Sequence, residues 1–162
     1  MDDRLFRRAM GTFATGVTVI TAGNPDTDGI HGMTANAFMS VSLNPKLIVI
    51  SIGEKARMLE KIRKNKRFAV NILSSGQKDL SMVFAGQKND EGNIAFDELS
   101  GIPVLQDAMT KITCEVVNEH TEGDHTLFIG KVLDIAFDED AEDPLIFFKG
   151  EYRSLLTKET VK

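Results

Sequence analysis

The chain has 162 residues, of which 42% are hydrophobic and 27% are charged, and its formal net charge is −5 at pH 7. This length and composition are typical of one globular domain, and the acidic balance argues against general nucleic-acid binding, which needs a basic surface. No apolar run reaches the ~18 residues that span a membrane, and residues 1–10 lack the apolar segment of a signal peptide. We therefore expect one cytoplasmic domain over residues 1–162, with no nucleic-acid or membrane partner.

The first half of the chain alternates between strand-like and helix-like patterns. An apolar stripe within residues 5–13 predicts a short N-terminal helix, and the β-branched residues 17–21 predict a strand. Turn-forming residues over 23–29 predict the tip of a hairpin. The continuous apolar run 47–52 predicts a strand buried on both faces, and the change of period over 56–65 predicts a surface helix.

The second half is expected to contain one more helix among strands. Ser74 and Gln77 have the spacing of a capping box, and the helix after them should end near Gly86. Residues 88–100 are polar and predict a loop. Apolar or alternating patterns predict strands over 68–73, 111–118, 126–137 and 144–148.

Roughly six or seven strands with only three short helices do not form a regular βαβ alternation. The predicted fold class is therefore mainly β: an antiparallel barrel or sheet with short peripheral helices.

Few residues favour hydrolytic or metal chemistry. The single cysteine, Cys114, excludes an intramolecular disulfide, and the alternation around it favours a buried, inert thiol. The three histidines, at 31, 120 and 125, lack the spacing of zinc ligands. The sequence also contains no dinucleotide fingerprint, P-loop or nucleophile elbow. We expect no metal site.

Residues 32–37 (GMTANA) are smaller than the residues of most strands. One interpretation is a close crossing of two segments, for which small side chains leave room. The other is a platform on which backbone N–H and C=O groups reach the edge of a planar polar ring. The spacing alone leaves both interpretations open.

Two further stretches are candidates for ligand binding. Gly53 and Lys55 precede the helix expected near Ala56, and a helix N-terminus with free N–H groups suits a phosphate, with Ser51 and Arg57 able to assist. The alternative is a solvated basic helix face, because residues 55–67 contain seven Lys or Arg. The second stretch is the Gly-Asp-His turn at 123–125, which on its own is typical of an exposed hairpin.

Taken in order, several motifs resemble the short flavin reductase family, the reductase components of two-component flavin-dependent monooxygenases. The motifs are FATGVTVIT (13–21), GMTANAF (32–38), SVSLNP (40–45), FAVNIL (68–73), FAG (84–86), GIPVL (101–105), GDHTLFIG (123–130) and PLIFFKGEYR (144–153). They cover nearly the whole chain, and the resemblance is strongest to reductase components of phenol monooxygenases.

The resemblance implies an FMN-binding split barrel of Greek-key type and a homodimer with the flavin near the subunit interface. It also implies reduction of FAD, with FMN as the alternative, by hydride transfer from NADH. Reduced flavin would then diffuse to a separate oxygenase that acts on an aromatic, phenol-type substrate. The alternative is a non-enzymatic flavin-binding protein on the same fold, or a barrel that binds no cofactor.

The resemblance also implies which positions bind the cofactors. The flavin ring would contact Gly32, Met33, Thr34, Ala35, Asn36, Phe38 and Met39. The ribityl phosphate would contact Ser51, Ile52, Gly53, Lys55, Ala56 and Arg57. The flavin site would be completed by Phe84, Ala85, Gly86 and Gln87. Dinucleotide contacts would come from Asn118, Glu119, His120, Phe147, Tyr152 and Arg153, and the nicotinamide would be oriented by His125.

Overall fold

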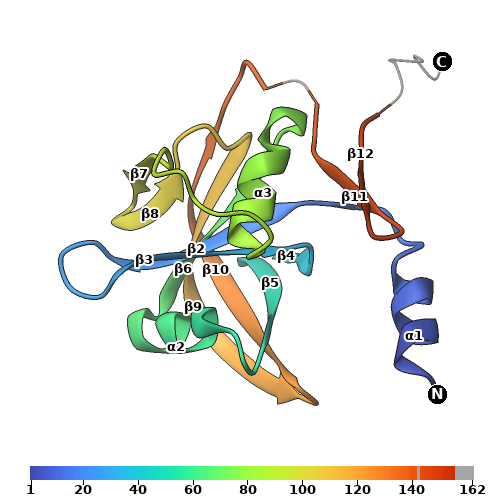
Figure 1. Ribbon diagram of the computed structural model, residues 1–162. Coiled ribbons are helices and arrows are strands. Elements are labelled where there is room, and N and C mark those ends of the chain that lie inside the picture. The colour runs from blue at the N-terminus through green and yellow to red at the C-terminus, as the bar shows by residue number, and fades with distance from the viewer. Residues whose placement is uncertain (142, 156–162) are drawn as a thin grey trace.

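The computed structural model describes residues 1–141 and 143–155 and is dominated by one antiparallel sheet (Figure 1). This sheet has seven strands in the order β3-β2-β6-β9-β10-β5-β4. Their bounds are Thr18–Asn24 (β2), Gly29–Ala35 (β3), Phe38–Leu43 (β4), Lys46–Gly53 (β5), Arg67–Ile72 (β6), Thr110–Glu122 (β9) and His125–Phe137 (β10). The predicted mainly β, antiparallel fold class is confirmed.

Two small sheets and three helices complete the described part of the chain. One sheet has the order β1-β11-β12, and the other pairs β7 with β8. The small strands are Thr15–Gly16 (β1), Phe96–Leu99 (β7), Ile102–Leu105 (β8), Ile146–Phe148 (β11) and Glu151–Arg153 (β12). The helices are Asp3–Met10 (α1), Arg57–Asn65 (α2) and Lys78–Phe84 (α3), the last preceded by a 3₁₀ turn over Ser75–Gln77.

The main core lies between α2 and one face of the large sheet. The helix buries Met58, Leu59 and Ile62, which pack in one cluster with Phe68 and Phe128 from the strands. A helix with such a narrow apolar stripe keeps its charged face in solvent. The predicted surface helix is thus confirmed, and α2 is held in place by the sheet.

The capping box predicted before α3 is confirmed. The Ser74 N–H donates to Gln77 Oε1 at 2.9 Å, and the Ser74 side chain accepts from the backbone of residue 77. The helix ends at Phe84, and Gly86 follows with a φ of +70°, a conformation that favours glycine. The end predicted near Gly86 is therefore also correct.

The structure corrects three predictions. Residues 88–100 are not all loop, because Phe96 and Leu99 in β7 pack against buried clusters and so give the polar stretch an inward-facing strand. The strand predicted over 144–148 begins only at Ile146. The strand over 47–52 is not buried on both faces: Ile48, Ile50 and Ile52 are buried, whereas the alternate residues stay partly exposed.

The N-terminal helix forms as predicted but lies apart from the large sheet, beside β11 and β12 (Figure 1). None of its residues is buried, and Leu5 and Phe6 are each more than half exposed. The residue that follows α1, Gly11, is linked to the turn between β11 and β12: the Lys149 backbone N–H donates to Gly11 O at 2.7 Å. Among the residues that the structure describes, the apolar stripe of α1 is thus not covered by a buried contact and stays largely exposed.

The predicted inert thiol is confirmed: Cys114 is fully buried, and burial raises its pKa to about 12. None of the helices in the described ranges has the length and apolar character to cross a membrane. Over the same ranges, no three or more His, Cys, Asp or Glu side chains are grouped as metal ligands.

A buried amide joins the small β7–β8 sheet to the large one. Asn71, on β6, donates from Nδ2 to Val19 O at 2.9 Å and to Thr21 Oγ1 at 3.0 Å, and its Oδ1 accepts from Leu105 N at 2.8 Å. Thr21 in turn donates to Pro103 O. Since every polar atom of the Asn71 side chain is paired, its burial is stabilising.

We expect Asn71→Leu to lower the free energy of unfolding by about 2–4 kcal/mol, because it leaves the buried Leu105 N–H and Val19 C=O without their partner. Urea denaturation measures this loss. Thr113→Val is the matched control, since its buried hydroxyl makes only a 3.4 Å contact, to Asp134 O, and its removal should cost less than about 1 kcal/mol. Equal losses in the two variants would contradict a central role for Asn71.

Candidate functional site

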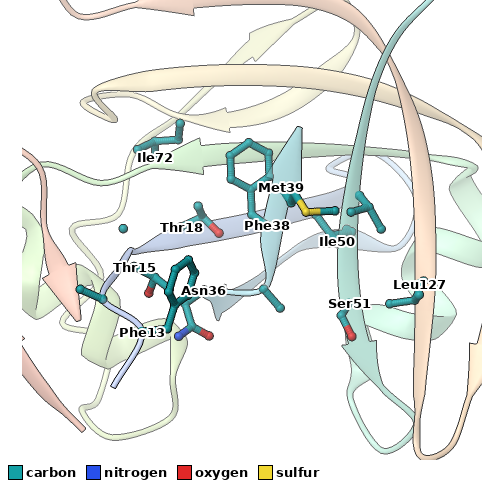
Figure 2. A pocket seen from close by; sticks show the side chains of 14 residues that line it. Phe13, Thr15, Thr18, Asn36, Phe38, Met39, Ile50, Ser51, Ile72 and Leu127 are labelled. Atoms are coloured by element: carbon teal, nitrogen blue, oxygen red, sulfur yellow. The ribbon is translucent and has the colours of Figure 1, made fainter. Parts of the chain in front are cut away.

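A cavity of about 600 Å³ opens where the two edge strands of the large sheet meet (Figure 2). Its walls are mainly apolar, with a few hydroxyl and amide side chains. The polar side chains are Thr15, Thr18, Asn36 and Ser51, and the remaining lining residues are Phe13, Ala14, Gly16, Ala37, Phe38, Met39, Val49, Ile50, Ile72 and Leu127. This size and mixture are typical of a small-molecule site.

Gly32 and Thr34, which precede the cavity in the sequence, face α3. Gly32 lies against the Phe84 ring, and a Cβ on it would come within 2.3 Å of Phe84 Cε1. The Thr34 hydroxyl donates to Ser81 O at 2.7 Å, so it also faces α3. The close-crossing interpretation is therefore correct for Gly32 and Thr34.

The next residues leave the sheet and form the cavity wall. The Thr18 hydroxyl donates to Ala35 O at 2.6 Å, at the end of β3. Asn36 and Ala37 then connect β3 to β4 and are exposed toward the cavity. The backbone of Ser51 in β5 donates to Ala37 O at 3.2 Å. The platform interpretation requires that Asn36 and Ala37 border the cavity, as they do here, and binding of a planar ring at this position stays a prediction.

The remaining candidates of the 32–39 stretch divide in the same way. Phe38 and Met39 line the cavity, and Met39 is 60% exposed. Met33 and Ala35 pack against the main core instead. Side chains of this stretch therefore reach the cavity only from Asn36 onward.

Beyond Ser51, β5 leads to the start of α2. Gly53 ends the strand, and Ala56 occupies the N-cap position of α2, where it has no side-chain group to cap the helix. Lys55 and Arg57 are exposed beside this helix end, whereas the side chain of Ile52 is fully buried in the core. A helix N-terminus without a side-chain cap and with two exposed cationic side chains beside it is a suitable anion site.

His125 begins β10 and is paired with Gly53 across the sheet. Its ring lies over that glycine, since a Cβ on Gly53 would be 3.6 Å from His125 Nε2. Its Nδ1 is 2.7 Å from Asp124 Oδ1, and this hydrogen bond lowers the pKa of Asp124. The imidazole is therefore oriented by its neighbour and lies near the end of the cavity bounded by Ser51.

Strand register separates the three candidates on β9. Paired residues of neighbouring strands point to the same face of a sheet. His120 is in register with Leu127 and Ser51, so it faces the cavity side, and Asn118 lies on that face too, in register with Ile129. Glu119 points to the opposite face.

On that opposite face Glu119 forms ion pairs with Arg63 at 3.1 Å and Lys66 at 3.7 Å, which hold β9 to the end of α2.

The candidates at the end of α3 surround its C-terminus. Phe84 packs edge to face on Phe96, with ring centroids 6.4 Å apart. Both rings pack against a buried cluster that is separate from the main core. Ala85, Gly86 and Gln87 are exposed. None of these four residues lines the cavity.

The last candidates lie on the β11–β12 hairpin, one strand away from the cavity. Phe147 is paired with Thr15 on one side and with Tyr152 on the other. The Tyr152 hydroxyl is 2.8 Å from Ser81 Oγ, which fixes the hairpin to α3. Arg153 pairs with Glu151 at 2.5 Å and is exposed.

The sequence interpretation did not assign a role to several lining residues. Phe13, Thr15 and Thr18 lie in the FATGVTVIT motif, and Leu127 lies in the stretch after His125. Strand alternation placed Leu127 on the same face as His125, so this residue could have been found. Nothing in the sequence indicates that Phe13 and Thr15 approach Asn36.

An antiparallel sheet whose edge strands are joined by a short bridge, with an apolar cavity at the bridge, defines a class of small β-barrels suited to a planar ligand. Residues 10–156 match the model of the flavin reductase like domain. The chain belongs to this family.

A curated relative and two solved structures are similar over most of their length. An NADH-dependent flavin reductase from a Rhodococcus species is 42% identical over 92% of this chain and 84% of its own. The flavin reductase PheA2 in its native state is 62% identical, with a TM-score of 0.91 over 97% of this chain and all of its own. The styrene monooxygenase flavin reductase of Pseudomonas putida S12 is 37% identical, with a TM-score of 0.86 over 94% and 98%.

These similarities confirm the predicted split barrel and the flavin reductase family. Other relatives at 36% identity are NADH-dependent reductases of FMN in one case and of FAD in another.

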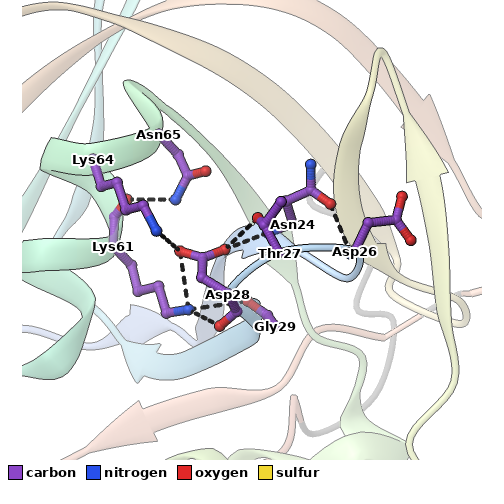
Figure 3. A network of polar contacts seen from close by, with 8 residues as sticks. All are labelled: Asn24, Asp26, Thr27, Asp28, Gly29, Lys61, Lys64 and Asn65. Carbon is purple, nitrogen blue, oxygen red and sulfur yellow. Dashed lines mark hydrogen bonds and ion pairs between the residues drawn. The ribbon is translucent and has the colours of Figure 1, made fainter.

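On the core side of the sheet, the tip of the β2–β3 hairpin is fixed to α2 (Figure 3). Asp28 pairs with Lys61 at 3.2 Å and with Lys64 at 3.4 Å. Its carboxylate also accepts from Asn24 N at 3.0 Å, and this bond, followed by the two lysines, holds the pKa of Asp28 well below its usual range. Lys61 additionally donates to the backbone carbonyls of Asp28 and Gly29.

His31 lies beside the middle of this basic helix. It is paired with the buried Ala22, so it faces α2 from the edge strand β3. Burial, and then the positive charges of Lys61 and Arg57, lower the pKa of His31 below 6.5.

We therefore expect the protein to lose stability as the pH falls below 6.5, the value for an unperturbed histidine. The unfolded chain takes up this proton first, so acid favours unfolding until the pH reaches the lower pKa of the folded state. Urea denaturation at pH 7.5 and pH 5.5 should show a smaller pH effect for His31→Asn than for the wild type. An equal effect in both would contradict this role of His31.

Proposed function

We propose that the cavity holds the ring of a flavin, which the chain reduces with NADH. The chain is an oxidoreductase of the flavin reductase family, and its relatives are NADH-dependent reductases of FAD and FMN. The observation that carries this assignment is the arrangement along β5: Ser51 lines the apolar cavity beside Asn36 and Ala37, and the strand runs on from Ser51 to the uncapped N-terminus of α2.

The residues present fit a flavin. Its flat ring suits the apolar walls, with Asn36, Phe38 and Met39 at its faces and edge. Its phosphate suits the backbone N–H groups at the start of α2, with charge from Lys55 and Arg57. At Ile52 only the backbone is available, because the side chain is buried in the core. Gly32, Thr34 and Phe84 would support the site through packing.

A bound flavin supplies the redox chemistry, because its ring can take up a hydride from a nicotinamide. The chain contributes position and environment. The apolar walls exclude water from one side of the ring, and Asn36 offers an amide N–H to its polar edge, where donors stabilise developing negative charge. His125, fixed by Asp124, orients the nicotinamide and has no need to transfer a proton.

The dinucleotide is expected to approach from the β9–β10 side. Asn118 and His120 share the cavity face with His125, which supports contacts to NADH. Glu119 would act indirectly, by holding β9 to α2. The β11–β12 hairpin, which contains Tyr152, is paired with Thr15 through Phe147. It would therefore border the dinucleotide at the Thr15 end of the cavity, away from His125.

A homodimer is also proposed. The large apolar side chains of α1 are each more than half exposed, and large apolar residues are also exposed on β4 and β10, among them Leu43 at 84% and Phe137 at 67%. Exposed apolar surface of this kind is typical of an interface. Phe13 and Met39 are exposed at the cavity, so an interface there would place the flavin near the partner subunit.

Several relatives are reductase components of two-component monooxygenases, and the similarity to the styrene monooxygenase reductase supports an oxygenase partner. We infer delivery of reduced flavin by diffusion, because the cavity is open to solvent at exposed residues such as Met39. An aromatic, phenol-type substrate for the oxygenase and a cytoplasmic location belong to the same proposal, as does FAD as the preferred flavin.

The proposed function predicts that purified protein oxidises NADH rapidly only when FAD or FMN is added, and that reduced flavin accumulates without oxygen. Stopped-flow absorbance of NADH and of flavin measures both steps. Flavin binding without NADH oxidation would instead support a non-enzymatic flavin-binding protein. Absence of flavin binding would support a barrel without a cofactor.

The variant Ala37→Phe tests whether the flavin ring binds against Asn36 and Ala37. A ring at this exposed position would fill the space above the platform, so flavin affinity should fall at least tenfold while the thermal midpoint stays near that of the wild type. Ala95→Phe is the control, because Ala95 is also exposed but lies outside the cavity. Ala37 is a better probe than Ala35, which packs against the core.

His125→Ala should raise the Michaelis constant for NADH and lower turnover, each by roughly threefold to tenfold, because the nicotinamide loses an orienting contact. Flavin affinity should change little. Steady-state kinetics with NADH as the varied substrate measure the effect. If neither kinetic constant moved, the assignment of His125 to the nicotinamide would be wrong.

A further inference from the structure

Thr15 has a hydroxyl that the fold does not use. The residue lies in the two-residue strand β1, where it is paired with Phe147, and it borders the cavity near Asn36 (Figure 2). Its Oγ1 atom is buried and has no hydrogen-bond partner among the residues that the structure describes. It is the one buried side-chain polar atom in those residues without a partner.

Two other threonines near the cavity differ from Thr15, because their hydroxyls have hydrogen-bond partners. The Thr18 hydroxyl donates to Ala35 O at 2.6 Å, and the Thr34 hydroxyl donates to Ser81 O at 2.7 Å. A buried hydroxyl without a partner costs free energy, whereas a valine of the same shape would fill the space without that cost. Packing alone therefore gives no reason for a hydroxyl at position 15.

We propose that the Thr15 hydroxyl hydrogen-bonds the isoalloxazine ring of the bound flavin. Rotation about the Cα–Cβ bond exchanges the hydroxyl with the methyl group, so the oxygen can reach the cavity without backbone movement. This inference rests on the proposed function, since it assigns a contact to the ligand of the same cavity.

The position of Thr15 indicates that its hydroxyl would contact the flavin ring and not the phosphate-bearing tail. Ser51 and the start of α2 lie at one end of the site, and Thr15 lies across the cavity from Ser51 (Figure 2). A flavin with its phosphate at α2 extends its tail past Ser51, so the group that reaches Thr15 is the ring. Thr15 and Asn36 then hold the same end of the ligand.

The test compares Thr15→Val with Thr15→Ser in equilibrium titrations with two probes, FMN and lumiflavin, which has the ring but no ribityl phosphate. Thr15→Val should weaken both by about tenfold, the loss of one hydrogen bond, and Thr15→Ser should bind as the wild type does. Thermal unfolding without flavin should show no lower midpoint for Thr15→Val, because that variant loses no intramolecular hydrogen bond.

Three results would overturn the proposal: unchanged affinity in Thr15→Val, weaker binding of FMN alone, or a lower midpoint without flavin, which would reveal a structural partner for the hydroxyl. Thr18→Val is the contrasting control, since loss of its bond to Ala35 O should lower the midpoint. The proposed function fails separately, if the wild type binds neither probe.

Discussion

The bridge formed by Asn36 and Ala37 is the constraint on which the rest of the structure depends. The edge strands of the large sheet, β3 and β4, are consecutive in the chain, so the bridge brings together the two ends of the sheet. Thr18 Oγ1 holds the Ala35 carbonyl from β2, and Ser51 N holds the Ala37 carbonyl from β5. These two hydrogen bonds fix each end of the bridge to the strand beside it, and the cavity lies next to the bridge.

The same arrangement explains why one short stretch needs so many small residues. Gly32 must admit the Phe84 ring, Ala35 must fit against the core, and Ala37 must leave the cavity open. The close-crossing interpretation of GMTANA is therefore correct for Gly32 and Thr34, whereas the ring-platform interpretation stays a prediction for Asn36 and Ala37, which line the cavity. Sequence spacing could not separate them, because the role of each residue depends on whether α3 or the cavity faces it.

Local patterns predicted the elements whose stability is local, and missed those that depend on distant partners. The narrow stripe of α2 and the Ser74–Gln77 capping box are contained in a few consecutive residues, and both were correct. β7 owes its strand form to pairing with β8 and packing against clusters far along the chain. Thr15 was missed for a similar reason: β1 has only two residues, and its partner β11 lies near the opposite end of the chain.

Under the proposed function, the site must meet two opposing requirements. Hydride transfer needs the ring held in a fixed orientation, whereas delivery to an oxygenase needs the reduced ring to leave. In this arrangement the polar groups would hold the two ends of the ligand, at Thr15 and Asn36 and at the start of α2, while the cavity is lined on its open side by the exposed Phe13 and Met39. A ligand held by its ends can be oriented by a few hydrogen bonds and still be released through the open side, because no buried segment has to move.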